Sequence, residues 1–116
     1  MHEFSIAVSI IEIAEKEARK AGAAEITELT LDVGTMSGIE FYALDTALEM
    51  AVKKTMLERA KLTINKIQAR AKCSECGYEF DINNVFDPCP KCTSLFHESL
   101  SGKELKIKSI IVDVDE

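Results

Sequence analysis

The chain has 116 residues, of which 47% are hydrophobic and 29% charged, and its formal net charge is −6. A chain of this length can bury one modest core, and its composition is that of a folded protein rather than a disordered one. The excess of acidic residues argues against nucleic acid and anionic membranes as partners, because binding to phosphate groups requires clustered Lys and Arg.

The sequence also bears on where the protein works. It has no run of about 20 apolar residues, as a membrane span requires, and its first residues lack the basic and apolar regions of a secretion signal. We therefore expect a cytoplasmic protein. Its four cysteines should remain reduced there, which favours metal ligation over disulfide bonds.

The first elements are a helix and a strand. Residues 4–21 have apolar side chains at steps of three and four, which predicts an amphipathic helix that stops at Gly22. Residues 26–33 alternate between apolar and polar side chains, which predicts a half-buried strand ending at Gly34.

A second helix and two more strands follow. Ser37 and Glu40 have the spacing of a capping box, and helical periodicity continues to about Met56. Residues 62–67 and 105–114 are predicted strands, each with an alternation that slips by one residue. The predicted fold class is therefore α+β, with two helices packed on one face of a small three-stranded sheet.

Residues 70–103 differ from the remainder of the chain. They contain all four cysteines and both prolines, and they have hardly any periodic apolar pattern. We interpret them as an inserted, loop-rich module. The predicted domains are thus an α+β domain of residues 1–69 plus 104–116 and a zinc-binding domain of residues 70–103.

The cysteines form two C-x-x-C pairs, Cys73 with Cys76 and Cys89 with Cys92, separated by 12 residues. This spacing is close to that of Cys₄ zinc sites, in which a tight turn aims each pair of sulfurs at one ion. Four thiolates close the zinc shell and leave no position for an activated water, so we predict a structural zinc ion. A redox role is disfavoured because neither pair follows a strand and precedes a helix.

Two residues near these cysteines raise questions of geometry. Gly77 follows the first pair and can adopt the positive φ that a metal knuckle often requires, whereas Thr93 occupies the matching position after the second pair. His97 is a candidate auxiliary ligand, but four thiolates already satisfy zinc. We expect His97 to lie at the surface, and its replacement by Ala to leave both metals bound.

The N-terminal sequence Met1-His2-Glu3 offers a different kind of site. A histidine at a terminus is usually a solvated side chain. Here, however, the Met1 amine, the His2 backbone nitrogen and imidazole, and the Glu3 amide can form consecutive chelate rings. Such a plane of nitrogen ligands suits Ni(II) or Cu(II) better than zinc. Glu3 can instead simply stabilise a helix N-terminus by its charge.

Taken together, these residues resemble the HypA/HybF family of hydrogenase nickel-incorporation proteins. The resemblance rests on Met1-His2-Glu3, on residues 33–40 (VGTMSGIE), on the two cysteine pairs and on residues 101–110 (SGKELKIKSI). It extends over essentially the whole chain. Thr93 departs from the family pattern, which usually has Gly after the last cysteine.

The resemblance implies a nickel metallochaperone, not an enzyme. Such a protein works with a maturation GTPase of the HypB type to load Ni(II) into the [NiFe] hydrogenase large subunit, and in some bacteria it also serves urease through its accessory proteins. Carried over to this sequence, His2 is the essential nickel ligand, Met1 and Glu3 contribute amine and amide nitrogens, and the four cysteines hold zinc. The protein would be a monomer or a homodimer.

The sequence leaves two other classes of function. A zinc-ribbon adaptor for protein or nucleic acid is the alternative, although residues 70–103 carry four basic and five acidic side chains, a poor match to phosphate. An enzyme is disfavoured because the sequence contains no phosphate-binding loop, dinucleotide fingerprint or nucleophile elbow, and only two histidines.

Overall fold

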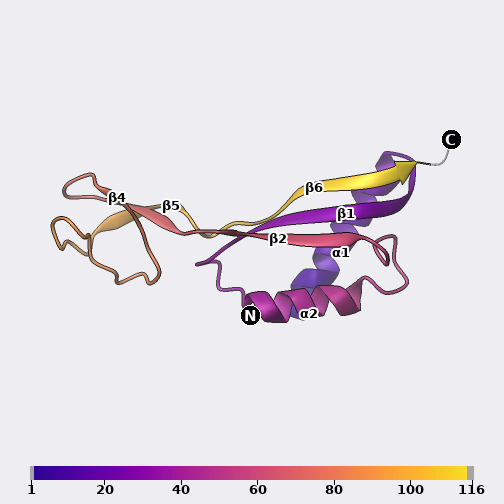
Figure 1. Ribbon diagram of the computed structural model, residues 1–116, viewed down its shortest axis with the longest axis horizontal. Helices are drawn as coiled ribbons and strands as arrows, with labels where there is room; N and C mark the ends of the chain where they lie inside the picture. Colours follow the sequence, from indigo (N-terminus) through magenta and orange to yellow (C-terminus); the bar gives the residue numbers. More distant parts are fainter. Residues whose placement is uncertain (1, 115–116) are drawn as a thin grey trace. The chain divides into compact units, whose positions relative to one another are not determined.

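The computed structural model describes residues 2–114 (Figure 1). Its elements in chain order are α1 (Glu3–Lys20), β1 (Ala23–Gly34), α2 (Phe41–Ala51), β2 (Lys61–Ile67), β3 (Arg70–Cys73), β4 (Glu79–Asp81), β5 (His97–Ser101) and β6 (Leu105–Val114). These elements fall into two compact units. The first is drawn from Met1–Asp32, Ile39–Asn65 and Lys106–Glu116, and the second from Val33–Gly38 and Lys66–Leu105.

Helix α1 confirms the predicted amphipathic helix. Its buried side chains are those of the apolar stripe, namely Ala7, Ile10, Ile11, Ala14 and Ala18. The helix ends before Gly22, whose φ of +73° takes the chain out of helical geometry at little steric cost. No helix within residues 2–114 is both long enough and apolar enough to cross a membrane.

The first unit contains the three-stranded sheet that the sequence predicts, in the order β2-β1-β6. The central strand β1 buries Leu29 and Leu31 in this unit, and Val33, which the second unit includes, is buried at the end of the same strand; these are the residues that alternate in the sequence. The other large, fully buried side chains of this unit are Ile26, Leu44, Leu48 and Leu57. Because each such side chain contributes about 1.5–3 kcal/mol on burial, this core accounts for most of the unit's driving force.

Helix α2 begins and ends differently from the prediction. Glu40, rather than Ser37, is the N-cap residue, and its carboxylate accepts hydrogen bonds from the N–H groups of Tyr42 and Ala43 at 3.2 and 2.5 Å. The helix ends at Ala51 rather than Met56, because Lys54 adopts a left-handed φ of 64° that a helix cannot contain. Both parts of the helix prediction were therefore wrong, although the helix itself is present.

The second unit contains a sheet that periodicity did not predict. Its order is β4-β3-β5, with both pairs antiparallel. Ala71 of β3 lies opposite Phe80 of β4 and Ser99 of β5, and Cys73 lies opposite His97. These strands have three to five residues, too few for a clear alternation to show in the sequence.

Three chain segments approach closely near Gly102, within the second unit. The N–H of Met36 donates to the carbonyl of Gly102 at 2.8 Å, and a side chain on Gly102 would reach Ala69 at 2.3 Å. A side chain on Gly34 would lie 2.0 Å from the Gly102 backbone. A Cβ atom does not fit at either position, so the close approach of the backbone segments explains why both residues are glycine.

Candidate metal centre

The first cysteine pair forms a turn that begins at the last residue of β3. The N–H of Gly77 donates to the carbonyl of Cys73 at 3.0 Å, and the N–H of Cys73 donates to the carbonyl of Tyr78 at 2.8 Å. Gly77 has a φ of +78°, which closes this turn. The backbone therefore turns back on itself and brings the Cys76 sulfur to the same side as that of Cys73.

The second pair repeats this geometry. The N–H of Thr93 donates to the carbonyl of Cys89 at 2.9 Å, and the N–H of Cys89 donates to the carbonyl of Ser94 at the same distance. Thr93 has a φ of +62°, and so it adopts the left-handed conformation that Gly77 adopts in the first turn. Thr instead of Gly at position 93 therefore raises the conformational free energy of the turn but leaves the backbone geometry the same.

The two turns bring all four sulfurs together, within 4.8 Å of one another. Cys73 and Cys92 are 3.5 Å apart at sulfur, and Cys76 and Cys89 are 3.6 Å apart. A tetrahedral Zn²⁺ with Zn–S bonds of about 2.3 Å places its sulfurs about 3.8 Å apart, so this donor set fits zinc in number, type and spacing. Cys73 and Cys89 are buried, whereas Cys76 and Cys92 are exposed.

The sulfurs of this group influence one another's protonation. The N–H of Cys76 points at the Cys73 sulfur and, with smaller contributions from the N–H of Glu75 and the neighbouring thiols, lowers the pKa of that thiol to about 6. The N–H of Ser94 acts in the same direction on Cys92, but the neighbouring sulfurs outweigh it and raise the Cys92 pKa to about 12. Four sulfurs this close cannot all be anionic without a cation among them, which is the electrostatic basis for metal binding.

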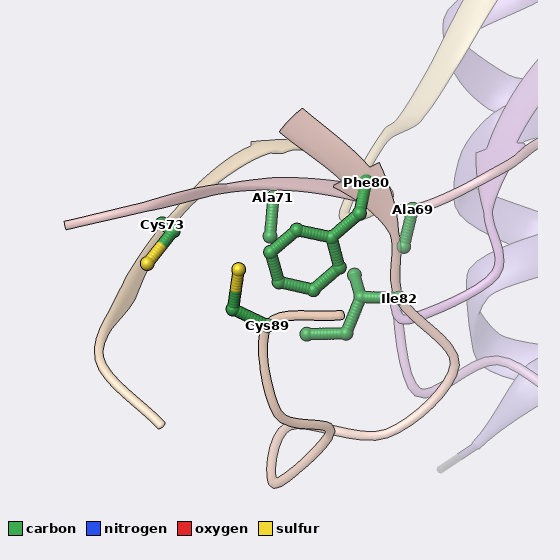
Figure 2. Close-up of a cluster of buried hydrophobic side chains, with 6 residues drawn as sticks. All are labelled: Ala69, Ala71, Cys73, Phe80, Ile82 and Cys89. Carbon is green, nitrogen blue, oxygen red and sulfur yellow. The ribbon is translucent and has the colours of Figure 1, made fainter. Parts of the chain in front are cut away.

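The core of the second unit is small and includes two of these cysteines. It consists of Ala69, Ala71, Cys73, Phe80, Ile82 and Cys89. Figure 2 shows the Phe80 ring at the centre of this cluster, beside Ala71 and Ile82, with the cysteine side chains at its edge. Since so few apolar side chains are buried, a bound metal would supply much of the folding free energy of the unit.

Aromatic contacts connect the two turns. The ring of Tyr78 stacks on that of Phe80 with centroids 6.3 Å apart, and the Nζ of Lys91 lies 5.2 Å from the centre of the Tyr78 ring. Tyr78 follows the first cysteine pair, and Lys91 lies between the cysteines of the second. Such a cation–π contact contributes about 0.5–1 kcal/mol at an exposed site.

His97 lies in this unit but outside the cysteine cluster that the described residues form. Its ring is half-buried, packs edge-on against Phe80 at 6.2 Å, and has Nε2 3.1 Å from the carbonyl oxygen of Val85. Its Nδ1 is buried without a hydrogen-bond partner among the described residues. We therefore find His97 packed within its unit rather than solvated at the surface.

The N-terminal residues lie in the other unit. Met1 lies outside the described residues. His2 is exposed and is the N-cap residue of α1, and Glu3 is the first residue of that helix. The Glu3 carboxylate accepts a hydrogen bond from the N–H of Glu40 at 3.2 Å. Glu40 is thus a neighbour of the N-terminal tripeptide. The sequence did not predict this contact, because residues 3 and 40 are too far apart in the chain for a sequence motif to relate them.

Comparison with known proteins identifies the family. Residues 1–112 match the family described as hydrogenase/urease nickel incorporation, metallochaperone, hypA. The chain belongs to the HypA family. The resemblance that the sequence indicated is thereby confirmed, as is an α+β fold with a four-cysteine cluster.

Individual HypA proteins are similar along their whole length. The hydrogenase maturation factor HypA of Parabacteroides distasonis is 43% identical over 112 residues, which cover 97% of each chain. That of Geobacter metallireducens is 38% identical over 113 residues, covering 97% of this chain and all of the relative. The solution structure of the Ni metallochaperone HypA from Helicobacter pylori aligns with a TM-score of 0.69 at 25% identity and covers 99% of this chain.

Proposed function

We propose that this HypA-family protein binds one Ni(II) ion through its N-terminal tripeptide and delivers that ion during [NiFe] hydrogenase maturation. The observation that carries the proposal is the family match over residues 1–112, combined with an exposed histidine at position 2 that precedes a helix. The ligands would be the Met1 amine, the His2 amide and imidazole nitrogens, and the Glu3 amide nitrogen.

The local structure supports this choice of ligands. The first four N–H groups of a helix have no intrahelical partner, and Glu3 is the first residue of α1. The first backbone hydrogen bond here runs from the N–H of Ile6 to the carbonyl of His2. Nickel can therefore displace the amide protons of His2 and Glu3 without breaking a helical hydrogen bond.

The Glu3 carboxylate has a separate role in this proposal. It accepts a hydrogen bond from the N–H of Glu40, the residue that precedes α2, and this contact holds the first residue of α1 in place. Because that carboxylate is already engaged, we assign it to positioning the tripeptide rather than to nickel. Residues held before the metal arrives lose less conformational entropy on binding.

Acid should release the nickel. The amine, imidazole and amide ligands all bind the metal without their protons, so protons compete with Ni(II) for the same atoms. Affinity should rise as the pH increases and fall as it decreases. The site needs no buried pocket, so a partner can take the ion without unfolding the carrier.

The four cysteines complete the proposal with a structural zinc ion in the second unit. Cys73, Cys76, Cys89 and Cys92 would all bind it, which closes the shell and leaves no position for catalysis. We therefore propose that the chain has no enzymatic activity of its own. Energy for transfer would come from a GTPase partner of the HypB type, in the cytoplasm, where thiols remain reduced.

The hydrogenase large subunit would be the acceptor of the nickel. Accessory proteins of urease are a further acceptor to test, since the family description includes urease. Transfer is measurable as the amount of nickel that appears in purified large subunit when it is mixed with the nickel-loaded chain and the GTPase.

Calorimetric titration of Ni(II) into the zinc-loaded chain tests the nickel site. We expect one saturable site per chain that weakens in acid and is absent from His2→Ala. The matched control is His97→Ala, which removes the other histidine of the chain and should leave nickel binding unchanged. Binding that survives His2→Ala would make the N-terminus a solvated segment and would favour a zinc-ribbon adaptor instead.

A further inference from the structure

Residues 52–61, which run from the end of α2 to the first residue of β2, have a charge opposite to that of the chain. We call this segment the basic loop. Its four cations and one carboxylate give it a formal charge of +3, in a chain of −6 whose other residues therefore carry −9. The cations are Lys53, Lys54, Arg59 and Lys61, and the carboxylate is Glu58.

These cations are available to a partner. All four are exposed, and none of them forms an ion pair with any residue in the range 2–114. The carboxylate of α1 that contacts the loop, that of Glu15, is already engaged, since it pairs with Arg19 at 3.7 Å. The positive potential of the basic loop is therefore not neutralised from α1.

The basic loop is held in a defined conformation. Leu57 is fully buried, and successive turns are closed by backbone hydrogen bonds from Thr55 to Val52 and from Ala60 to Leu57, at 3.1 and 3.0 Å. Its middle is fixed to α1 because the N–H of Met56 donates to the carboxylate of Glu15 at 3.1 Å. A partner would meet cations on a preformed backbone, which lowers the entropic cost of binding.

The positive potential is centred on the lysines rather than on the arginine. A hollow of about 140 Å³ beside Arg59 is also lined by the carboxyl-bearing residues Glu25 and Glu58, and these acids offset the arginine. Lys53 and Lys54, at the other end of the loop, do not line this hollow.

We propose that the basic loop is a docking site for an acidic protein segment, that is, an exposed stretch rich in Asp and Glu on a partner protein. An acidic partner is repelled by the −9 of the remaining chain at short range, within a screening length of about 8 Å. The partner can approach closely only at a positively charged part of the surface, such as the basic loop. The loop would thus both attract the partner and fix the orientation in which the two proteins meet.

A nucleic acid fits the basic loop less well. A duplex carries a negative charge every 1.7 Å or so along its axis, and a bound strand would extend past four cations onto acidic surface. The loop also has no aromatic side chain on which a base could stack. A protein segment can confine its charge to a few residues. None of the proposed metal ligands lies in the loop, so this inference does not depend on the nickel site.

The test uses the full-length, zinc-loaded chain and a fluorescein-labelled synthetic peptide of alternating Glu and Asp with Gly spacers. Fluorescence anisotropy should show saturable binding that weakens with salt, and backbone amide shifts should change within residues 52–61. The variant Lys53→Glu/Lys54→Glu should weaken binding at least tenfold. Lys53→Gln/Lys54→Gln, which removes charge without reversing it, should weaken it by a smaller factor.

The matched control is Lys106→Glu/Lys108→Glu, which changes net charge equally at two exposed positions of β6. It should change the affinity by less than a factor of about two, the long-range effect of charge alone. Equal weakening by both double variants, or no binding by the wild-type chain, would overturn the proposal. Binding of a single-stranded DNA of similar length at the same amides, as tightly as the peptide, would overturn it in favour of a general polyanion site. Nickel binding by the variants should be unchanged.

Discussion

The backbone N–H of Glu40 donates a hydrogen bond to the carboxylate of Glu3, and it joins two residues that are 37 positions apart. Glu3 is the first residue of α1, and Glu40 is the N-cap of α2. The contact therefore connects the starts of both helices. It also links the proposed nickel ligands to the segment that precedes the second helix.

We predict that acid weakens this hydrogen bond between the starts of the two helices, because it protonates the Glu3 carboxylate. The N–H of Glu40 and the N–H of Glu3 itself lower the Glu3 pKa below its ordinary value of 4.5. A lowered carboxyl pKa means that the contact stabilises the fold above pH 4.5 and that this contribution is lost as the pH falls through the lower, folded-state value. Carboxyl NMR should find Glu3 titrating below 4.5, with the Glu40 amide shift following it.

A variant pair checks the origin of that effect. Glu3→Ala should increase hydrogen exchange of the Glu40 amide, since its acceptor is lost. Glu12→Ala removes an exposed carboxylate from the same helix and should leave that exchange rate as it is in the wild-type chain. If both variants increase exchange equally, then the helix charge rather than the contact is responsible.

The second cysteine turn should become more stable when Thr93 is replaced by Gly. A left-handed conformation costs a non-glycine residue about 1–2 kcal/mol, and Thr93 has a φ of +62°. Glycine removes that cost but gives up the hydrogen bond of the Thr93 hydroxyl to the Cys92 carbonyl at 2.6 Å. We expect a net gain of about 1 kcal/mol, visible as tighter zinc retention against a competing chelator.

The first turn supplies the converse experiment. Gly77 has a φ of +78°, and a Cβ there would meet no atom within 4 Å. Gly77→Thr should therefore weaken zinc retention by about 1–2 kcal/mol, through conformation alone. A Gly77→Thr chain that holds zinc as tightly as the wild type would show that the left-handed conformation at position 77 imposes no measurable cost on zinc binding.

Much of the first unit could be predicted from sequence because its elements are long and periodic. Helix α1 and strand β1 have 18 and 12 residues, enough for repeated apolar positions to define one buried face. The end of α2 could not be read in this way. Val52 continues the helical spacing of the buried residues Leu44 and Leu48, but Leu57 is buried by the turns that follow the helix.

The candidate site was also predicted only in part. The cysteine spacing alone indicated that four sulfurs would meet, and they do. The strands β3, β4 and β5 that carry or flank them were missed, because strands this short derive their stability from pairing and from metal rather than from an apolar face. The contact between Glu3 and Glu40 depends on tertiary structure, which no local pattern reports.

Removing zinc should unfold residues 70–103 and leave the first unit folded. Cys73 and Cys89 belong to the six-residue core of the second unit, and a zinc ion bound by four thiolates contributes on the order of 10 kcal/mol. Amide NMR after chelation should lose the dispersed signals of this segment and retain those of α1 and β1. Protease resistance of residues 70–103 that does not change on chelation would contradict this expectation.

Replacing Gly34 by Ala should prevent stable folding. A Cβ there would lie 2.0 Å from the backbone carbon and oxygen of Gly102, and neither atom can move independently. We expect a loss of at least about 3 kcal/mol, measured by thermal unfolding. Gly22→Ala is the control, because its φ is +73° but its Cβ meets no atom within 4 Å, so it should cost only about 1 kcal/mol. Equal losses in the two variants would point to backbone conformation rather than contact.

The sheet order β2-β1-β6 has a consequence for how the chain folds. Strand β6 lies beside β1 in the sheet, yet the chain between them includes α2, β2 and the whole cysteine-containing segment of residues 70–103. The search for this pairing is slowed by a long loop, and a module that folds around zinc shortens the flexible part of that loop. Zinc would thus act on the timing of assembly as well as on stability. Chains released into zinc-poor medium should complete the first sheet more slowly, even though that sheet carries none of the four cysteines.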